Sequence, residues 1–277
     1  MTCSPEERAQ RERLEAAYEK SQEPVMLSIE RSVCGCDYGG NSWTTETEAR
    51  QIAGRLGLKP GLRLLDLGAG AGWPGLFLRK TSGCDLVLVD LPFSGLRIAA
   101  QRAGTEAGPG RFGAALADAA ALPFPDGSFD AINHSDLLCC LREKRAVLEA
   151  CRRAIRRHGR MAFSVISITP GLSAEQYRRA VANGPEFVES DSDYPTLLSE
   201  TGWTPAERQD VTTAYADSCR RQLEADEAHG DELAALIGIA AFEERCADWR
   251  SKLTALADGL LRRELFLATP MAAGSGS

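Results

Sequence analysis

Acidic residues at the ends of apolar runs, together with a glycine-rich turn, carry the clearest chemical signal in this chain. Residues 64–75 read LLDLGAGAGWPG, so an apolar run ends in Asp66 and is followed by alternating glycines. Glycine adopts positive φ and lets a ligand approach the backbone closely. A helix is expected to open at Trp73-Pro74, where proline suits the first helical turn. A strand, a glycine turn and a helix N-terminus in this order predict a nucleotide-type site.

A second apolar run, residues 86–89, also ends in an acid, Asp90, twenty residues after Gly70. A carboxylate at this place can accept hydrogen bonds from both hydroxyls of a ribose. Residues 70–75 also satisfy the G-x-G-x-x-G pattern of nicotinamide dinucleotide sites. The glycine motif alone therefore leaves two ligand classes open.

The segment that follows separates the two classes. Residues 115–130, ALADAAALPFPDGSFD, resemble the part of class I S-adenosylmethionine-dependent methyltransferases that ends the third strand and leads into the fourth. Residues 66–72 resemble the first motif of that family, and Asp90 and Asp118 fall where the family has its second and third acids. The resemblance covers roughly residues 43 to 170, and three spaced motifs in order are far more specific than one glycine turn. Dehydrogenases lack the segment at 122–130.

The resemblance implies a function, a cofactor and a set of contacts. The expected function is methyl transfer from S-adenosyl-L-methionine to an oxygen or nitrogen of a small molecule by in-line displacement, with S-adenosyl-L-homocysteine as product. The methyltransferases of the ubiquinone, sarcosine and phosphoethanolamine type are the most similar kind. A catalytically silent cofactor-binding subunit and an NAD(P)-dependent oxidoreductase are the alternatives. The implied cofactor contacts are Asp66 to the methionine ammonium, the backbone of Gly68, Ala69 and Gly70 to the methionyl and ribose parts, Asp90 to the ribose hydroxyls, Leu91 to the adenine face, and Asp118 with the Ala119 N–H to the adenine edge. Solvated carboxylates at strand ends are the alternative for Asp90 and Asp118.

The residues after the fourth predicted strand are expected to face the reacting sulfur. Residues 133–136, NHSD, align loosely with a Ser-Arg-Asp step of the sarcosine and phosphoethanolamine methyltransferases, and Asn133 is a predicted cofactor contact. His134 is a candidate general base, because an ordinary imidazole pKa suits proton transfer at neutral pH. In the alternative its ring only packs. The chain departs from those relatives at Cys140, which aligns with a histidine that they use in catalysis.

Two aromatic residues precede the first expected helix of the core, in a segment that similar enzymes fold over the cofactor. Tyr38 is a candidate catalytic residue and Trp43 a candidate cofactor contact, because aromatic faces attract a sulfonium or ammonium. Gly39-Gly40 would supply hinge freedom. Packing of both rings on the edge of the sheet is the alternative.

Strands and helices alternate through most of the chain, which predicts a doubly wound, mostly parallel, seven-stranded Rossmann-like α/β sheet with helices on both faces. Strands are expected near 62–67, 85–89, 112–117, 129–133, 160–167, 205–211 and 263–268, and helices near 5–23, 46–56, 74–80, 94–107, 141–157 and 173–182. Residues 25–45 are expected to be irregular, and 5–23 to form a surface helix. The expected domains are an N-terminal helix and lid (1–45), a Rossmann-like core (46–211), a helical cap in two stretches split at His229-Gly230 (212–262), and a last strand with a flexible tail (263–277).

Composition narrows the class of protein. The chain has 277 residues and a net charge of −7, which argues against the phosphate-binding footprint of a nucleic-acid methyltransferase. The absence of a long apolar run argues against a membrane span, and the charged first residues against a secretion signal. Nine cysteines without a repeated framework suggest reduced thiols and a cytoplasmic protein. The scattered histidines show no metal-ligand spacing. The expected partner is a small-molecule substrate, and association as a homodimer is left open.

Overall fold

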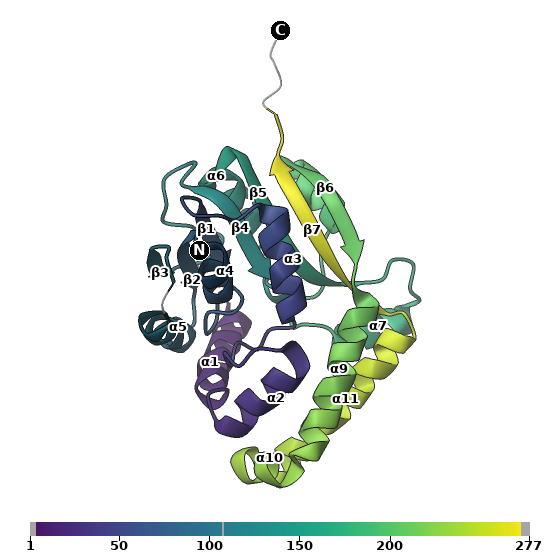
Figure 1. Ribbon diagram of the computed structural model, residues 1–277. Coiled ribbons are helices and arrows are strands. Elements are labelled where there is room, and N and C mark those ends of the chain that lie inside the picture. The colour runs from purple at the N-terminus through teal and green to yellow at the C-terminus, as the bar shows by residue number, and fades with distance from the viewer. Residues whose placement is uncertain (1–3, 107, 273–277) are drawn as a thin grey trace.

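A seven-stranded sheet forms the centre of the computed structural model, which describes residues 4–106 and 108–272 (Figure 1). The strand order is β3-β2-β1-β4-β5-β7-β6, with β1 to β5 parallel and β7 antiparallel to both of its neighbours. The predicted mostly parallel Rossmann-like sheet is confirmed. The strands are β1 (Arg63–Leu67), β2 (Asp85–Asp90), β3 (Phe112–Leu116), β4 (Phe129–Ser135), β5 (Ile155–Ile168), β6 (Trp203–Asp210) and β7 (Leu261–Pro270).

Helices cover both faces of the sheet, and each face has its own core. On one face, buried residues of α3 (Glu46–Leu56), α4 (Gly75–Ser82) and α5 (Phe93–Thr105) pack with Leu64, Leu86 and Leu88 of the sheet. On the other face, α6 (Lys144–Ala154) and α8 (Tyr194–Glu200) pack with Leu65 and Phe163, and α7 (Ala174–Asn183) adds Ala180. Because side chains alternate along a strand, neighbouring residues of β1 and β4 belong to different faces.

The helix expected over 141–157 is shorter than predicted. It ends at Ala154, and Ile155 already pairs with Phe129 at the start of β5. The pairing register then shifts between Phe129 and Ala131, which marks an irregularity in this pair of strands. The charged residues after Ile155 extended the helical pattern in the sequence, but pairing with β4 fixes them as strand. A short 3₁₀ turn, Leu138–Cys140, separates β4 from α6.

The N-terminal segment is more regular than the sequence suggested. Helix α1 spans Pro5–Lys20, and a second helix, α2 (Pro24–Cys34), occupies residues expected to be irregular. Pro24 starts α2 at a position that tolerates proline rather than breaking a helix. Val25, Ile29 and Val33, four residues apart, form the buried face of α2.

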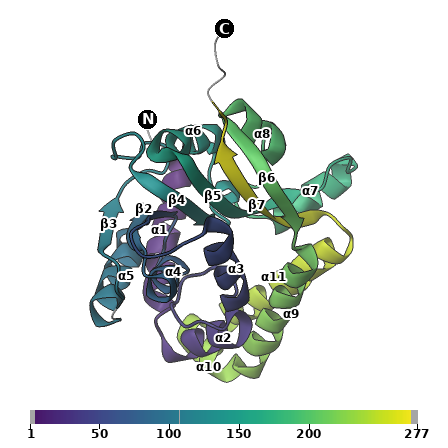
Figure 2. The ribbon, with the colours of Figure 1, turned by 45° about the horizontal axis from the view of Figure 1, so that its top comes forward.

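The helical cap lies between β6 and β7 and beside α2 (Figures 1 and 2). It contains three helices instead of two stretches: α9 (Thr212–Ala228), α10 (Gly230–Ile237) and α11 (Ile239–Ala257). Gly238, with a φ of 90°, provides the second break. The α1–α2 segment and the cap together cover one end of the sheet, so the residues at that end lie beneath helices from both ends of the chain.

Three findings concern the described residues alone. No helix there is long and apolar enough to cross a bilayer. No group of three or more histidine, cysteine or acidic side chains there is arranged to hold a metal ion. The eight cysteines at described positions are free thiols. The expected flexible tail, residues 274–277, lies outside the described residues, and the expected domain boundaries stay a prediction.

Candidate active site

The glycine turn follows β1 at the edge of the sheet where the parallel strands end. Gly68, Gly70 and Gly72 have φ angles of 63°, 49° and 101°, all in the region that favours glycine. The Ala69 N–H donates to the Val89 carbonyl at 3.2 Å, which fastens the turn to the end of β2. The backbone of the turn is therefore held in the conformation that close approach of a ligand requires.

Asp66 lies beneath this turn and is 1% exposed. Its Oδ1 accepts a hydrogen bond from Asn133 Nδ2 at 2.7 Å, and Asn133 occupies the matching register position on β4. Its Oδ2 has no hydrogen-bond partner among the described residues and lies so close to Gly75 that a Cβ there would be 2.4 Å away. Burial raises the pKa of Asp66 to about 7, against the effects of the Asn133 hydrogen bond and of the nearby Gly75 backbone N–H. Asn133 thus orients Asp66, and one buried carboxylate oxygen remains unpaired.

Asp90 ends β2 and reaches the glycine turn. Its Oδ2 accepts the Gly70 N–H at 2.7 Å, and its Oδ1 accepts the Leu91 N–H at 2.8 Å. Burial raises the pKa of Asp90 to about 6, although these two hydrogen bonds favour the charged form. Leu91, the next residue, is 36% exposed. A carboxylate and an accessible apolar side chain are therefore adjacent at this edge.

Asp118 lies two residues beyond the end of β3, the strand that pairs with β2. Its side chain is exposed, and its Oδ1 accepts the Ala120 N–H at 2.9 Å. Ala119 is 8% exposed. Asp66, Asp90 and Asp118 thus all lie at the carboxyl edge of the sheet, at or just beyond the ends of three adjacent strands.

Helix α1 covers the glycine turn, a contact that the sequence did not reveal. A Cβ on Gly70 would lie 2.8 Å from Tyr18 Oη, so the phenol rests directly on the turn. Tyr18 is 6% exposed, and burial, with the nearby Asp90 carboxylate, raises its pKa. Helix α1 is therefore not a simple surface helix. Leu14 and Tyr18, four residues apart in a largely charged helix, were the available signal.

Glu15 fastens α1 to the start of α5. Its carboxylate accepts the N–H groups of Phe93 at 2.6 Å and Ser94 at 2.8 Å. Pro92, the N-cap residue of α5, provides no side-chain cap of its own. A residue of α1 therefore supplies the missing helix cap, next to Asp90 and Leu91.

His134 projects from the opposite face of the sheet to Asp66 and Asn133. Its ring stacks on Phe163 with centroids 4.7 Å apart, and the side chain is fully buried. Neither ring nitrogen has a hydrogen-bond partner among the described residues, and burial lowers the pKa of His134 to about 3. A base with so low a pKa is poorly matched to proton transfer near neutral pH. This geometry favours the packing alternative over the general base.

Tyr38 packs on the glycine turn, but its hydroxyl is directed elsewhere. Its ring lies 5.2 Å from that of Trp73, and its Oη donates to Glu106 Oε2 at 3.0 Å. Burial, followed by the charge of Glu106, raises the pKa of Tyr38. The Arg102 guanidinium lies 4.3 Å from the centre of the ring. The phenol is thus held by α5, which leaves the predicted catalytic role without a supporting contact.

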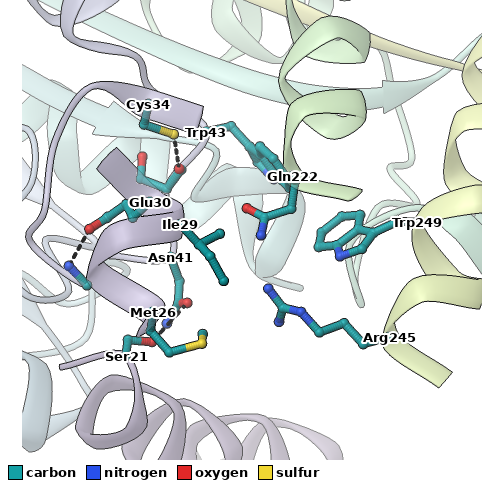
Figure 3. A pocket seen from close by; sticks show the side chains of 12 residues that line it. Ser21, Met26, Ile29, Glu30, Cys34, Asn41, Trp43, Gln222, Arg245 and Trp249 are labelled. Carbon is teal, nitrogen blue, oxygen red and sulfur yellow. Dashed lines mark hydrogen bonds between the residues drawn. The ribbon is translucent and has the colours of Figure 1, made fainter. Parts of the chain in front are cut away.

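Trp43 lies in a pocket between the N-terminal segment and the cap (Figure 3). Its ring makes edge-to-face contacts with Tyr215 at 5.2 Å and Trp249 at 5.4 Å, both from the cap. The cavity has a volume of about 200 Å³. Gly39 and Trp43 line it, whereas Gly40 between them packs against Trp73 of the glycine turn. One segment of chain therefore contacts the glycine turn and also lines the pocket.

The chemical groups at the carboxyl edge match the cofactor that the sequence resemblance implies, while the Tyr18 ring occupies the space over Gly70. A Cβ at Gly68 would lie 2.7 Å from Leu137, so the turn leaves no room for a side chain. Asp66 offers an unpaired buried oxygen that could face an ammonium group. Asp90 and Leu91 offer a hydrogen-bond acceptor and an apolar surface side by side. Together these groups could hold the amino-acid and adenosyl ends of one ligand.

Comparisons with known proteins point the same way. A family model described as a methyltransferase domain matches residues 65–163. The 27-O-demethylrifamycin SV methyltransferase of Amycolatopsis mediterranei is 30% identical over 207 residues, which cover 73% of this chain and 75% of that protein. A phosphoethanolamine N-methyltransferase of Triticum aestivum is 23% identical over 220 residues, or 79% of this chain and 43% of that protein. The chain thus spans less than half the length of this plant relative.

A solved structure shares the fold. Phosphoethanolamine N-methyltransferase 2 of Haemonchus contortus, in complex with phosphomonomethylethanolamine and S-adenosylhomocysteine, superposes with a TM-score of 0.76 at 20% identity. The match covers 94% of this chain and 60% of that one. At this identity the likeness concerns the fold alone.

Proposed function

This chain belongs to the class I S-adenosylmethionine-dependent methyltransferases, and from that premise we propose that it transfers a methyl group to an oxygen or nitrogen of a small molecule. The family predicted from the three spaced motifs is confirmed. The glycine motif alone was compatible with both a nicotinamide dinucleotide and S-adenosylmethionine, and membership of this family excludes the nicotinamide-dependent oxidoreductase.

The observation that supports the proposal is the contact of Asp90 with the glycine turn, with Asp118 following the adjacent strand at the same edge of the sheet. S-adenosylmethionine, when bound, supplies a methyl group attached to a positively charged sulfur. This sulfur is a good leaving group because it departs as a neutral thioether. The protein chiefly has to orient the reacting atoms. In the proposal Asp90 accepts the ribose hydroxyls, Asp118 and the Ala119 N–H contact the adenine edge, and Asp66 faces the methionine ammonium. The Tyr18 ring would have to leave Gly70, or slide along it, to admit the cofactor.

The lid and the cap are proposed to enclose the methyl acceptor. Trp43 lines the pocket between them, and the neighbouring Gly40 contacts Trp73 of the glycine turn. A substrate in this pocket would therefore lie close to the chain segment that borders the cofactor edge. Ordered closure of such a segment excludes water and aligns the reactants.

Replacement of Asp118 tests the cofactor site. The side chain is exposed, so Asp118→Ala should leave the fold intact. Loss of a hydrogen bond to the adenine edge should weaken S-adenosylhomocysteine binding by on the order of 1–3 kcal/mol, measured by calorimetry. Asp126→Ala is the matched control, because Asp126 is an exposed acid in the loop that enters β4 from the opposite edge. Equal affinities for Asp118→Ala and wild type would contradict the assigned contact.

A methyl-release assay distinguishes the enzyme from a silent subunit. With labelled S-adenosylmethionine and extracted small-molecule pools, an enzyme transfers label to an acceptor over many turnovers. A silent subunit binds the cofactor in the calorimeter but releases no labelled product. No binding of S-adenosylhomocysteine at high micromolar concentration would remove the proposal altogether.

A further inference from the structure

The pocket between the lid and the cap contains a guanidinium with unused hydrogen-bond donors. Arg245 of α11 donates from Nε to Asp226 Oδ2 at 2.6 Å and from Nη2 to Asp226 Oδ1 at 3.1 Å. Its Nη1 makes no hydrogen bond with any described residue. Figure 3 shows the guanidinium extending from the cap into the pocket, toward Met26 and Ile29 of α2. Both N–H donors of Nη1 therefore remain for a ligand in this pocket.

Asp226 fixes the orientation of that guanidinium in advance. The carboxylate is fully buried, and it also accepts Gln222 Nε2 and Trp249 Nε1, each at 2.8 Å. A buried carboxylate with four donors is fully satisfied, and it holds the planar fork of arginine in one orientation. A ligand that binds Nη1 would therefore cost little further conformational entropy of the Arg245 side chain. Preorganisation of this kind is typical of a recognition site.

The surroundings of Arg245 are aromatic, apolar and cationic. Two cationic groups lie over the Trp249 ring: Arg245 Cζ is 5.8 Å and Lys252 Nζ is 5.3 Å from the ring centre. Lys252 Nζ makes no hydrogen bond with any described residue. Met26 and Ile29 form the facing wall. A flat ring would gain burial against these walls, and an acidic oxygen would be attracted to the Arg245 guanidinium that lines the pocket.

Glu30 also lines this pocket, but its carboxylate is not free to repel an acidic ligand or to pair with Arg245. Both carboxylate oxygens of Glu30 are engaged, since they accept the N–H groups of Gly39 at 2.6 Å and Gly40 at 3.0 Å. Burial raises the pKa of Glu30, which favours its neutral form. Glu30 therefore shapes the lid, and Arg245 offers open hydrogen-bond donors where it lines the pocket.

We propose that the methyl acceptor is an aromatic small molecule with an acidic oxygen, a carboxylate or a phenolate, which binds Arg245 Nη1. The ring lies between Trp43 and Trp249 on one side and Met26 and Ile29 on the other. This inference rests on the proposed function for the role of the pocket, but its binding chemistry can be tested without turnover.

Two probes of the same shape test the inference. Naphthalene-2-carboxylate carries the acidic oxygen, and naphthalene-2-carboxamide lacks the charge. Each is titrated into the full chain by calorimetry, with and without S-adenosylhomocysteine. Wild type should bind the carboxylate at least about tenfold more tightly than the carboxamide, as expected for a charge-assisted contact. In Arg245→Gln that preference should disappear, mainly through weaker carboxylate binding.

Three further variants complete the design. Arg250→Gln removes the same charge from the same helix at an exposed residue that pairs with Glu227, and it should bind like wild type. Arg245→Gln alone leaves the Asp226 carboxylate buried without its cation and could unfold the protein. The double variant Arg245→Gln with Asp226→Asn leaves no unpaired buried charge, so it tests the same loss of the guanidinium in a folded protein. Asp226→Asn alone keeps the Arg245 guanidinium but no longer fixes its orientation. It should weaken carboxylate binding by a smaller factor than Arg245→Gln does.

The outcomes separate the two proposals. Equal binding of the two probes by wild type, no binding of either, or an unchanged preference in the double variant would overturn the aromatic-acid assignment. If wild type prefers the carboxylate but does not bind S-adenosylhomocysteine, the proposed function fails while the pocket assignment stands. If S-adenosylhomocysteine binds and the probes are not distinguished, only the assignment of the substrate class fails.

Discussion

At the residue scale, neighbouring positions of β4 serve opposite faces of the sheet. Asn133 pairs in register with Asp66 and donates to it, whereas His134 pairs with Leu67 and stacks on Phe163. The sequence could place His134 at the end of a strand near the reacting edge. It could not determine which face the ring would take, because a β-bulge or a shift of one residue reverses the face.

Replacement of His134 distinguishes packing from base catalysis. His134→Phe keeps a ring against Phe163 and removes two unpaired nitrogens, so methyl transfer should remain near the wild-type rate. Loss of a general base would instead lower the rate by about 10²–10⁴-fold. A steady-state assay with an acceptor identified by methyl release decides between these outcomes.

The same variant should alter stability at low pH. The pKa of His134 is lowered from 6.5 to about 3, so only the unfolded chain gains the proton as the pH falls below 6.5. Wild type should therefore lose about 2 kcal/mol between neutral pH and pH 5 from this group, and His134→Phe should not. Urea unfolding at several pH values measures the difference. His158→Phe, at an exposed histidine of β5, is the control and should keep the wild-type dependence.

At the element scale, α1 is attached to the cofactor edge through the helix cap that Glu15 provides to α5. Glu15→Ala should lower the free energy that holds α1 against α5 by about 1 kcal/mol, the usual contribution of a helix cap. Because Tyr18 of α1 rests on Gly70, a looser helix should bind and release S-adenosylhomocysteine roughly fivefold faster. Stopped-flow fluorescence measures both rate constants.

Glu19→Ala is the matched control for that prediction. Glu19 also lies on α1 and also contacts α5, but it forms an exposed ion pair with Arg97, which contributes little to stability. Its loss should leave both rates nearly unchanged. Equal effects of the two variants would show that charge, rather than the helix cap, controls access.

The elements were largely predictable from the sequence, and their contacts were not. Apolar runs that end in acids located β1 and β2, because buried parallel strands are nearly continuous in apolar residues. Helix α2 was missed because Pro24 suggested a break, whereas proline is also favoured at the first helical position. Contacts such as Glu15 with Ser94 join residues 79 positions apart and depend on the packing of helices, which no local pattern encodes. The Arg245 pocket needed α2 and α11 together for the same reason.

At the scale of the whole molecule, the buried acids at the carboxyl edge should make the free energy of unfolding depend on pH. Asp66 has its pKa raised from 3.8 to about 7, so the folded state holds a proton that the unfolded chain releases near pH 4. The contribution of Asp66 to stability is therefore fully present below about pH 4 and is lost as the pH rises through 7. Asp90, with a pKa of about 6, acts in the same direction.

Asp66→Asn isolates this contribution. The variant keeps an acceptor for Asn133 and carries no titrating group, so its unfolding free energy should lack the Asp66 part of the slope. Between pH 4 and pH 8 the difference between wild type and variant should change by on the order of 4 kcal/mol, measured by urea unfolding without ligand. The contribution of His134 is present in both proteins and cancels in the difference, and that of Asp90 cancels apart from its charge interaction with Asp66. A constant difference across this range would mean that Asp66 is ionised in the folded protein at acidic pH.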